Sequence, residues 1–312
     1  MPSTRSIRVA LWAWHSPYIS LLANALPEVT FYTLPTPYCP GGWNYAHRPL
    51  PSNVHPHDGI FVVSEFPDVV IAQTERDFNF MPASWDDGPA MIFLGHNRPE
   101  MESQSLIDRL NWIGNGSPDG AYVTISPMKC EAWKAAVPND EWHTILPYVN
   151  VEDYGGWTGE GGYILTVANN LRRPLFDKAA WLEATRGLPV KLVGEGNSGI
   201  PGAVGPAQSW DDLKSLYRCA AVYLNVTRKG VEDAWNLSLL EAMATGVPCV
   251  STQLDWQLHG VASGTPLRHV VEDALNGDTP WHVDEQRERL AEQFPLDRFR
   301  QSWLSVLERV TA

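Results

Sequence analysis

The chain has 312 residues, of which 44% are apolar and 11% aromatic, so it is long enough to bury two cores of about 150 residues each. Its net charge of −13 argues against non-specific attraction to nucleic acids or anionic membranes, which depends on Lys and Arg. No apolar run approaches the ~18 residues needed to cross a bilayer, and no export signal precedes the first strand pattern. We therefore expect a globular, cytoplasmic protein without a membrane span.

The first half of the sequence alternates strand and helix patterns. A strand at 7–12, a helix at 15–26 and a strand at 29–32 are followed by strands at 59–63, 69–72, 90–94 and 121–125. Short β-branched and apolar runs of this kind are typical of buried strands in a parallel sheet. The sequence therefore predicts an α/β domain.

One segment of this half, 36–56, is rich in Pro, Gly and aromatic residues and is too long for a simple connection. We expect a functional surface loop there. Its Trp43-Asn44-Tyr45 stretch, together with Trp12 and Trp14, is a candidate for stacking on a sugar ring or a nucleobase.

The second half repeats the alternation after a glycine-rich stretch. Segment 147–162 contains five glycines and no apolar periodicity, which favours a linker between domains. Strands are predicted at 163–167, 190–193, 221–224 and 248–251, with helices at 177–186, 210–220 and 237–245 between them. A last amphipathic helix is predicted from the spacing of Phe299, Trp303, Val306, Leu307 and Val310.

The most informative stretch, 231–252, has the order acidic loop, helix, glycine stop and strand. Asp233 precedes the helix, whose free N–H groups at Asn236, Leu237, Ser238 and Leu239 form a positive end able to hold a diphosphate. Glu241 lies about one turn inside the helix, where a carboxylate is placed to accept hydrogen bonds from ribose hydroxyls. The stretch therefore predicts a nucleotide site.

This stretch resembles the donor site of retaining GT-B glycosyltransferases of the family-4 type, which carry two acidic residues separated by seven and then Ala-Met-Ala-x-Gly-x-Pro-x-Val. Asp233 and Glu241 have this spacing, with Asp where the family usually has Glu. Arg173 and Lys178 match the spacing of the family's basic pair, whose charges offset the departing diphosphate without a metal. The Asn169-Asn170 insert leaves Arg172 as an alternative to Arg173.

Two further features agree with the resemblance. Gly194 and Gly196 resemble the family's glycine turns beside the nucleotide base, and His96, directly after a strand, resembles its cleft histidine. The resemblance implies a GT-B fold, with two facing Rossmann-like domains at 1–155 (acceptor) and 156–295 (donor). It leaves open that a helix at 296–312 crosses back to the N-terminal domain. It also implies that Asp233 and His96 orient the donor hexose.

The function that follows is transfer of a hexose from a nucleoside-diphosphate sugar to an acceptor hydroxyl, with retention and with no metal or resident cofactor. The expected acceptor is a saccharide or small molecule, and a modified DNA base stays open as an alternative. Two rivals also stay open: a nucleotide-sugar epimerase or sugar phosphorylase on the same fold, and a degenerate GT-B module that only binds. No G-x-S-x-G elbow, Walker lysine loop or His/Cys metal spacing supports another chemistry.

Overall fold

The computed structural model describes residues 6–57, 67–80, 88–116, 120–139, 141–228, 230–231, 236–252, 266–277 and 283–312. They fall into two compact units, one comprising residues 1–148 with 296–312 and the other comprising 149–295. Each unit contains its own sheet, and every pairing between neighbouring strands is parallel. The expected α/β class with parallel sheets is therefore confirmed.

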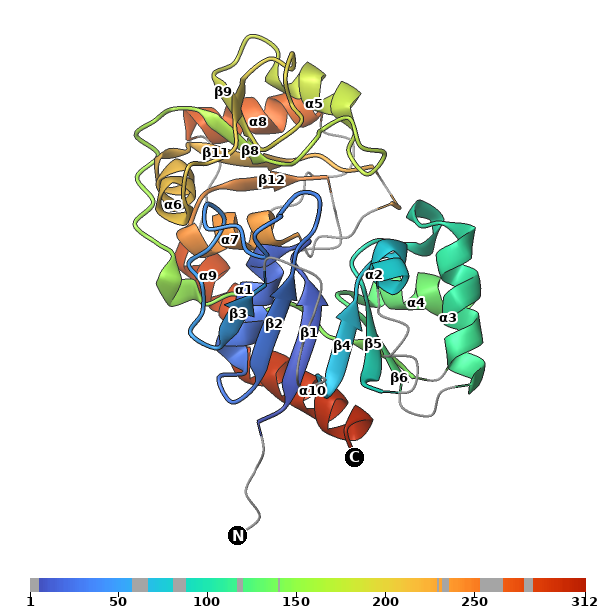
Figure 1. The fold of residues 1–312 in the computed structure, drawn as a ribbon. Coiled ribbons are helices and arrows are strands. Elements are labelled where there is room, and N and C mark those ends of the chain that lie inside the picture. The colour runs from blue at the N-terminus through green and yellow to red at the C-terminus, as the bar shows by residue number, and fades with distance from the viewer. Residues whose placement is uncertain are drawn as a thin grey trace. The chain divides into compact units, whose positions relative to one another are not determined.

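Unit 1 is built on a seven-stranded sheet in the order β3-β2-β1-β4-β5-β6-β7 (Figure 1). Its strands are β1 (Arg8–Trp12), β2 (Thr30–Leu34), β3 (Val54–Pro56), β4 (Val69–Ala72), β5 (Ala90–Gly95), β6 (Gly120–Thr124) and β7 (Trp142–Thr144). Its helices are α1 (Ser16–Ala25), α2 (Glu75–Phe80), α3 (Gln104–Gly116), α4 (Pro127–Ala136) and α10 (Leu296–Val310), with a 3-10 turn at Pro99–Met101.

The strand order of unit 1 reverses between β1 and β4. After β1 the chain adds strands on one side, and from β4 onward it adds them on the other. The loops that leave the carboxyl ends of β1 and β4 therefore diverge. Open α/β sheets bind ligands at such positions. One core cluster joins β4–β7 to α2, α3 and α4 through Phe78, Phe93, Leu106, Tyr122 and Trp133, among others.

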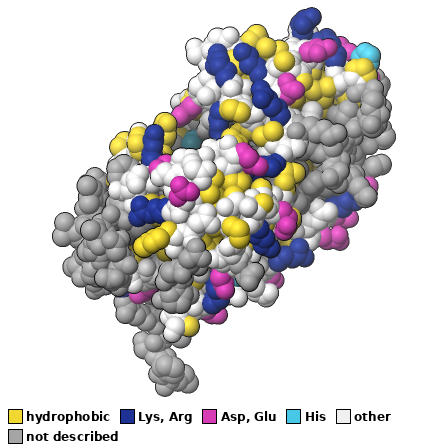
Figure 2. Space-filling model, turned by 90° about the vertical axis from the view of Figure 1, so that its right-hand side faces the viewer, with side chains coloured by type: hydrophobic (Ala, Val, Ile, Leu, Met, Phe, Trp, Pro, Cys, Tyr) yellow, Lys and Arg dark blue, Asp and Glu magenta, His cyan; other side chains and the backbone are white. Residues whose placement is uncertain are grey.

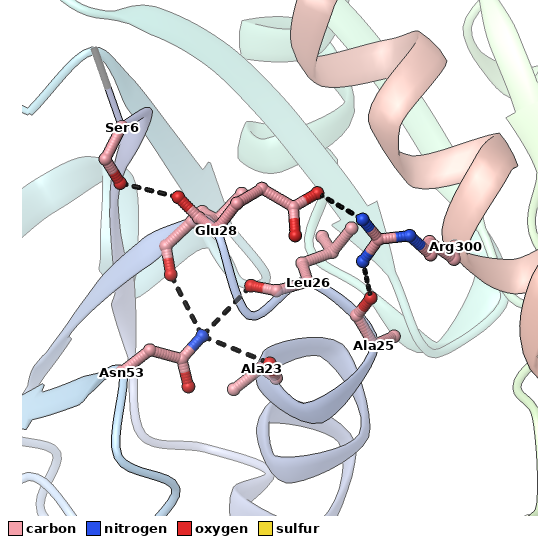
Figure 3. Close-up of polar contacts among 8 residues, drawn as sticks. Ser6, Ala23, Ala25, Leu26, Glu28, Asn53 and Arg300 are labelled. Atoms are coloured by element: carbon pink, nitrogen blue, oxygen red, sulfur yellow. Dashed lines mark hydrogen bonds and ion pairs between the residues drawn. The ribbon is translucent and has the colours of Figure 1, made fainter. Parts of the chain in front are cut away.

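Polar contacts attach α10 to the opposite end of the chain (Figure 3). Arg300 on α10 donates to the carbonyl of Ala25, the last residue of α1, and pairs with the Glu28 carboxylate at 2.8 Å. In the same group, the Asn53 amide nitrogen lies 3.1 Å from the Ala23 carbonyl and 3.0 Å from the Leu26 carbonyl. The Ala23 and Leu26 carbonyls also accept the Leu26 and Val29 backbone N–H groups, so Asn53 adds a second donor to each, and Arg300 supplies a donor to the Ala25 carbonyl at the helix end. The 296–312 segment predicted to form a helix is thus an integral part of unit 1.

Unit 2 is built on a five-stranded sheet in the order β10-β9-β8-β11-β12 (Figure 1). It opens with a 3-10 turn at Val151–Asp153 and contains strands β8 (Ile164–Val167), β9 (Val190–Val193), β10 (Ala203–Gly205), β11 (Val222–Asn225) and β12 (Cys249–Ser251). Its helices are α5 (Lys178–Thr185), α6 (Trp210–Cys219), α7 (Leu237–Thr245), α8 (Leu267–Asn276) and α9 (Val283–Gln293). The order reverses between β8 and β11, which is the kind of position at which open α/β sheets bind ligands.

Two expectations about the first half need comment. The strand expected at 59–63 lies outside the described residues. The interpretation of Trp12 and Trp43 as stacking residues is wrong, because Trp12 is 3% and Trp43 4% exposed and both rings belong to the interior. Trp43 instead holds the 36–56 loop together by donating its indole N–H to the Arg48 carbonyl at 3.0 Å.

No helix among the described residues combines the length and the apolar character that crossing a membrane requires.

Candidate functional site

In unit 2, the start of α7 lies against the carboxyl end of β8. Asn236 caps the helix, since its Oδ1 accepts from the Ser238 backbone N–H at 2.9 Å. The Ser238 hydroxyl lies 2.6 Å from this Oδ1 and 3.3 Å from the Val167 carbonyl, and it accepts from the Tyr223 hydroxyl at 2.9 Å. These bonds fix the helix start at the point where the strand order reverses. Leu237 and Leu239 belong to the same first turn, in which the Leu239 N–H donates to the Asn236 carbonyl at 3.1 Å, and the helix dipole favours an anion at this end.

Glu241 lies one turn further along α7, and it is only 5% exposed. Its Oε2 accepts from the Tyr217 hydroxyl on α6 at 3.2 Å. A buried carboxylate needs hydrogen-bond donors, and Tyr217 supplies one of them. The helix itself ends as the sequence predicts, with Gly246 in a left-handed conformation at φ 95°. Asp233, the other acidic residue of the motif, lies outside the described residues.

The two candidate basic residues follow β8. Arg173 lies in the loop between β8 and α5, and Lys178 is the first residue of α5, after the Asp177 cap. Both side chains are half-buried, and among the described residues neither makes a hydrogen bond or ion pair. The neighbouring Arg172 is engaged, because it donates to the Gly196 carbonyl at 2.8 Å and to the Ser198 carbonyl at 2.6 Å. This geometry favours Arg173 over Arg172 as the side chain available to a ligand.

The loop that carries these basic residues also contacts the segment after β11. Phe176 forms a β-bridge with Thr227, and the Arg228 backbone N–H donates to the Leu175 carbonyl at 2.9 Å. The carboxyl ends of the neighbouring strands β8 and β11 therefore carry loops that are bonded to one another. The helix start, the basic loop and the segment after β11 form one edge of unit 2.

Gly194 and Gly196 allow the loops after β8 and β9 to approach each other closely. Gly194 has φ +135°, and a Cβ added there would lie 2.3 Å from the Ala168 carbonyl oxygen. Gly196 has φ +72°, and its added Cβ would lie 3.1 Å from the Asn170 Cβ. Asn169 contributes to the same contact, because its Oδ1 accepts from the Glu195 backbone N–H at 2.9 Å. Glycine is thus required at both positions by the close contact between the two loops as well as by the backbone conformation.

In unit 1, His96 follows β5 and lies within a polar cluster at the carboxyl edge of the sheet. Its Nε2 is 3.1 Å from Gln73 Oε1, and its ring centroid is 4.4 Å from that of His15 and 5.0 Å from that of Tyr18. Burial, with further contributions from His15 and from Lys129, holds the pKa of His96 well below its usual value. His96 is therefore neutral at pH 7.

The sequence pattern did not identify Gln73 and Asp77 as part of this cluster. Asp77 is completely buried and accepts from the Gln73 backbone N–H at 2.6 Å, the Thr74 backbone N–H at 3.0 Å and the Trp14 indole at 2.5 Å. Burial raises its pKa to about 6, although these hydrogen bonds act in the opposite direction. The available signal was that polar residues follow directly after the apolar run of β4.

Of the expected aromatic platform, Trp14 is half-buried and Tyr45 is 64% exposed. The ring centroids of Trp14 and Tyr38 lie 6.0 Å apart in an edge-to-face arrangement, and Tyr38 is 75% exposed. Tyr38, in the same 36–56 loop as Tyr45, is a further exposed aromatic residue that the sequence pattern did not identify.

Comparison with known proteins gives a match at the level of fold. No family model matches the sequence, and no curated protein does. Among solved structures, a mutant of S. aureus TarM in complex with fondaparinux, alpha-GlcNAc-glycerol and UDP is similar with a TM-score of 0.59 and 10% identity, covering 77% of this chain and 55% of TarM. A second crystal structure of TarM gives a TM-score of 0.59 at 11% identity, covering 77% and 54%.

The chain thus spans little more than half the length of the TarM chains that it matches. At this identity the likeness concerns the fold, and it supports the glycosyltransferase fold that the sequence predicted.

Proposed function

We propose that this protein transfers a sugar from a nucleoside-diphosphate sugar to an acceptor hydroxyl. The observation that carries the proposal is the edge of unit 2, where the start of α7 and the loop bearing Arg173 and Lys178 occupy the carboxyl ends of adjacent strands. A diphosphate fits this combination, because the positive end of the helix dipole attracts its oxygens and two cations balance its charge. The fold shared with TarM, which was crystallised with UDP, supports the same conclusion.

In the proposed reaction, the donor diphosphate lies at the start of α7, where the helix dipole favours an anion, and Glu241 accepts hydrogen bonds from the ribose. Arg173 and Lys178 stabilise the negative charge that develops on the leaving diphosphate, which is the step that most needs electrostatic help. This assignment makes a metal unnecessary. The acceptor hydroxyl attacks on the face that the diphosphate leaves, so its proton passes to the departing phosphate and the anomeric configuration is retained.

For the acceptor, we propose a saccharide or a small hydroxylated molecule. Trp14 and the exposed Tyr38 and Tyr45 provide aromatic surface of the kind on which sugar rings stack. Figure 2 shows one face of the described residues, on which Lys and Arg are scattered among acidic and apolar side chains. With the net charge of −13, this distribution favours an uncharged acceptor over a nucleic acid.

The direct test is a thermal melt of the purified protein with UDP, GDP, ADP and TDP, without metal and then with Mg²⁺. A nucleoside diphosphate that binds the folded state at 100 times its Kd adds about 2.7 kcal/mol, which raises the Tm of domains of this size by roughly 5–10 °C. The matched control is the corresponding nucleoside, which lacks the diphosphate. If no diphosphate at millimolar concentration raises the Tm above its nucleoside, with or without Mg²⁺, the proposed function is wrong.

Once the base is known, activity separates the rivals. A transferase releases the nucleoside diphosphate from the sugar donor faster when acceptor is present, and the product's anomeric configuration is determined by NMR. Conversion of the donor to another nucleotide sugar would indicate an epimerase. Binding without any release would indicate a module that only binds.

A further inference from the structure

The side chain of Gln73 is held in one orientation. It is 4% exposed, and its backbone N–H is bonded to the buried Asp77 carboxylate at 2.6 Å. At the other end, its amide Nε2 lies 2.9 Å from the Trp12 carbonyl oxygen. Because a carbonyl oxygen only accepts hydrogen bonds, the NH₂ group must face Trp12 and the oxygen Oε1 must face the other way.

This orientation determines the proton position on His96. Gln73 Oε1, which only accepts, lies 3.1 Å from His96 Nε2, so Nε2 must carry a hydrogen. The groups facing the ring are His15 and Tyr18 from the start of α1 and Lys129 from α4, with Asp77 one step behind Gln73. Since the environment disfavours a second proton, Nδ1 is left with its lone pair. Among the described residues, Nδ1 makes no hydrogen bond.

We propose that Gln73 is a positioning residue, which holds His96 as the Nε2–H tautomer so that Nδ1 accepts a hydrogen bond from a substrate hydroxyl. That the hydroxyl belongs to a sugar rests on the proposed function, whereas the tautomer does not. A histidine in this state selects a hydroxyl donor and disfavours a group that can only accept. It thus discriminates a free hydroxyl from an ether or ester at the same position.

The test uses the full-length protein labelled with ¹⁵N at histidine, without any nucleotide. Long-range ¹H–¹⁵N spectra report which ring nitrogen carries the proton, and the His96→Gln variant identifies the His96 signals. The exposed His55 serves as the reference within the same spectrum. At pH 7, the ratio of the Nε2–H tautomer to the Nδ1–H tautomer should be about tenfold larger at His96 than at His55. A factor of this size is the usual effect of one hydrogen bond.

The Gln73→Leu variant removes the acceptor, and Gln104→Leu makes the same chemical change at an exposed site on α3. The tautomer excess at His96 should fall about tenfold in Gln73→Leu and stay unchanged in Gln104→Leu. An Nδ1–H tautomer or an imidazolium at pH 7 in the wild-type protein would overturn the proposal, even if Gln73→Leu failed to fold. A folded Gln73→Leu variant with an unchanged tautomer would overturn it as well.

Because these spectra need no ligand, their outcome is independent of the diphosphate melts that test the proposed function. If the tautomer is as expected and no diphosphate binds, the arrangement around His96 stands and the substrate class is wrong. If diphosphate binds and His96 carries its proton on Nδ1, the proposed function stands and the role of Gln73 is wrong.

Discussion

Replacing Gly194 with Ala tests how the nucleotide edge of unit 2 is built. Two penalties add at this position. The backbone conformation, φ +135°, is one that L side chains rarely adopt, and such strain costs about 1–3 kcal/mol. The new methyl group would also lie 2.3 Å from the Ala168 carbonyl oxygen and 2.7 Å from its carbon, both backbone atoms that cannot rotate away. Overpacking of this kind costs about 1–3 kcal/mol, so we expect a loss of roughly 2–6 kcal/mol in the free energy of unfolding.

The matched control is Gly187→Ala, in the turn before β9. Gly187 has φ +72°, but an added Cβ there meets no atom within 4 Å, so only a backbone cost of about 1 kcal/mol is expected. Unfolding of each variant in urea, followed by circular dichroism, gives the two losses. If Gly194→Ala is no more destabilising than Gly187→Ala, the two loops after β8 and β9 are not held in the close contact described above.

Three further predictions concern single carboxylates and cations. Glu241→Ala should weaken nucleoside diphosphate binding by about 1.5–3 kcal/mol in titration calorimetry, whereas Glu183→Ala, at an exposed position on α5, should leave the affinity unchanged. If Glu241→Ala binds the diphosphate as tightly as the wild type, Glu241 does not belong to the site. Lys178→Ala should lower turnover about 10²–10³-fold with Lys134→Ala as control, and activity within a few-fold of wild type would make Lys178 a surface residue. Burial raises the pKa of Asp77 from 3.8 to about 6, so between these pH values the folded protein keeps a proton that the unfolded chain releases. As pH rises from 4 through 6, the free energy of unfolding of the wild type should therefore fall by roughly 3 kcal/mol relative to that of Asp77→Asn. Parallel curves of unfolding free energy against pH for the two proteins would contradict this.

The sequence predicted the alternation of strands and helices well because local patterns determine it. The apolar run of β4, all four residues of which are buried, and the Asn236 cap with the Gly246 stop of α7 can each be identified from neighbouring residues alone. Short edge strands were missed, because three residues such as those of β3 and β7 give no period. Burial of aromatic residues was also misjudged, since Trp43 looks like a surface residue within a Pro- and Gly-rich loop.

The candidate site was predictable where it depends on spacing along the chain and not where it depends on distant contacts. Asn236 and Glu241 follow from the position of one helix, whereas the engagement of Arg172 with the Gly196 carbonyl requires the loop after β9 to be in place. The Gln73 amide is similarly fixed by Trp12, which is 61 residues away in the sequence. Contacts of this range leave no local pattern, so Gln73 and Asp77 could not be assigned beforehand.

The attachment of α10 to α1 has a consequence for biosynthesis. Residues 149–295 form a compact unit inserted between the two segments of unit 1, and α10, the helix of the second segment, is made after the whole of unit 2. A ribosome therefore completes the whole of unit 2 while Ala25 and Glu28 still lack their Arg300 partner. Domains usually fold in the order of their synthesis, but here the inserted unit 2 can finish first, and unit 1 must wait for α10. Stalled chains that stop before Leu296 should accordingly be protease-sensitive in the first 148 residues and protected in unit 2.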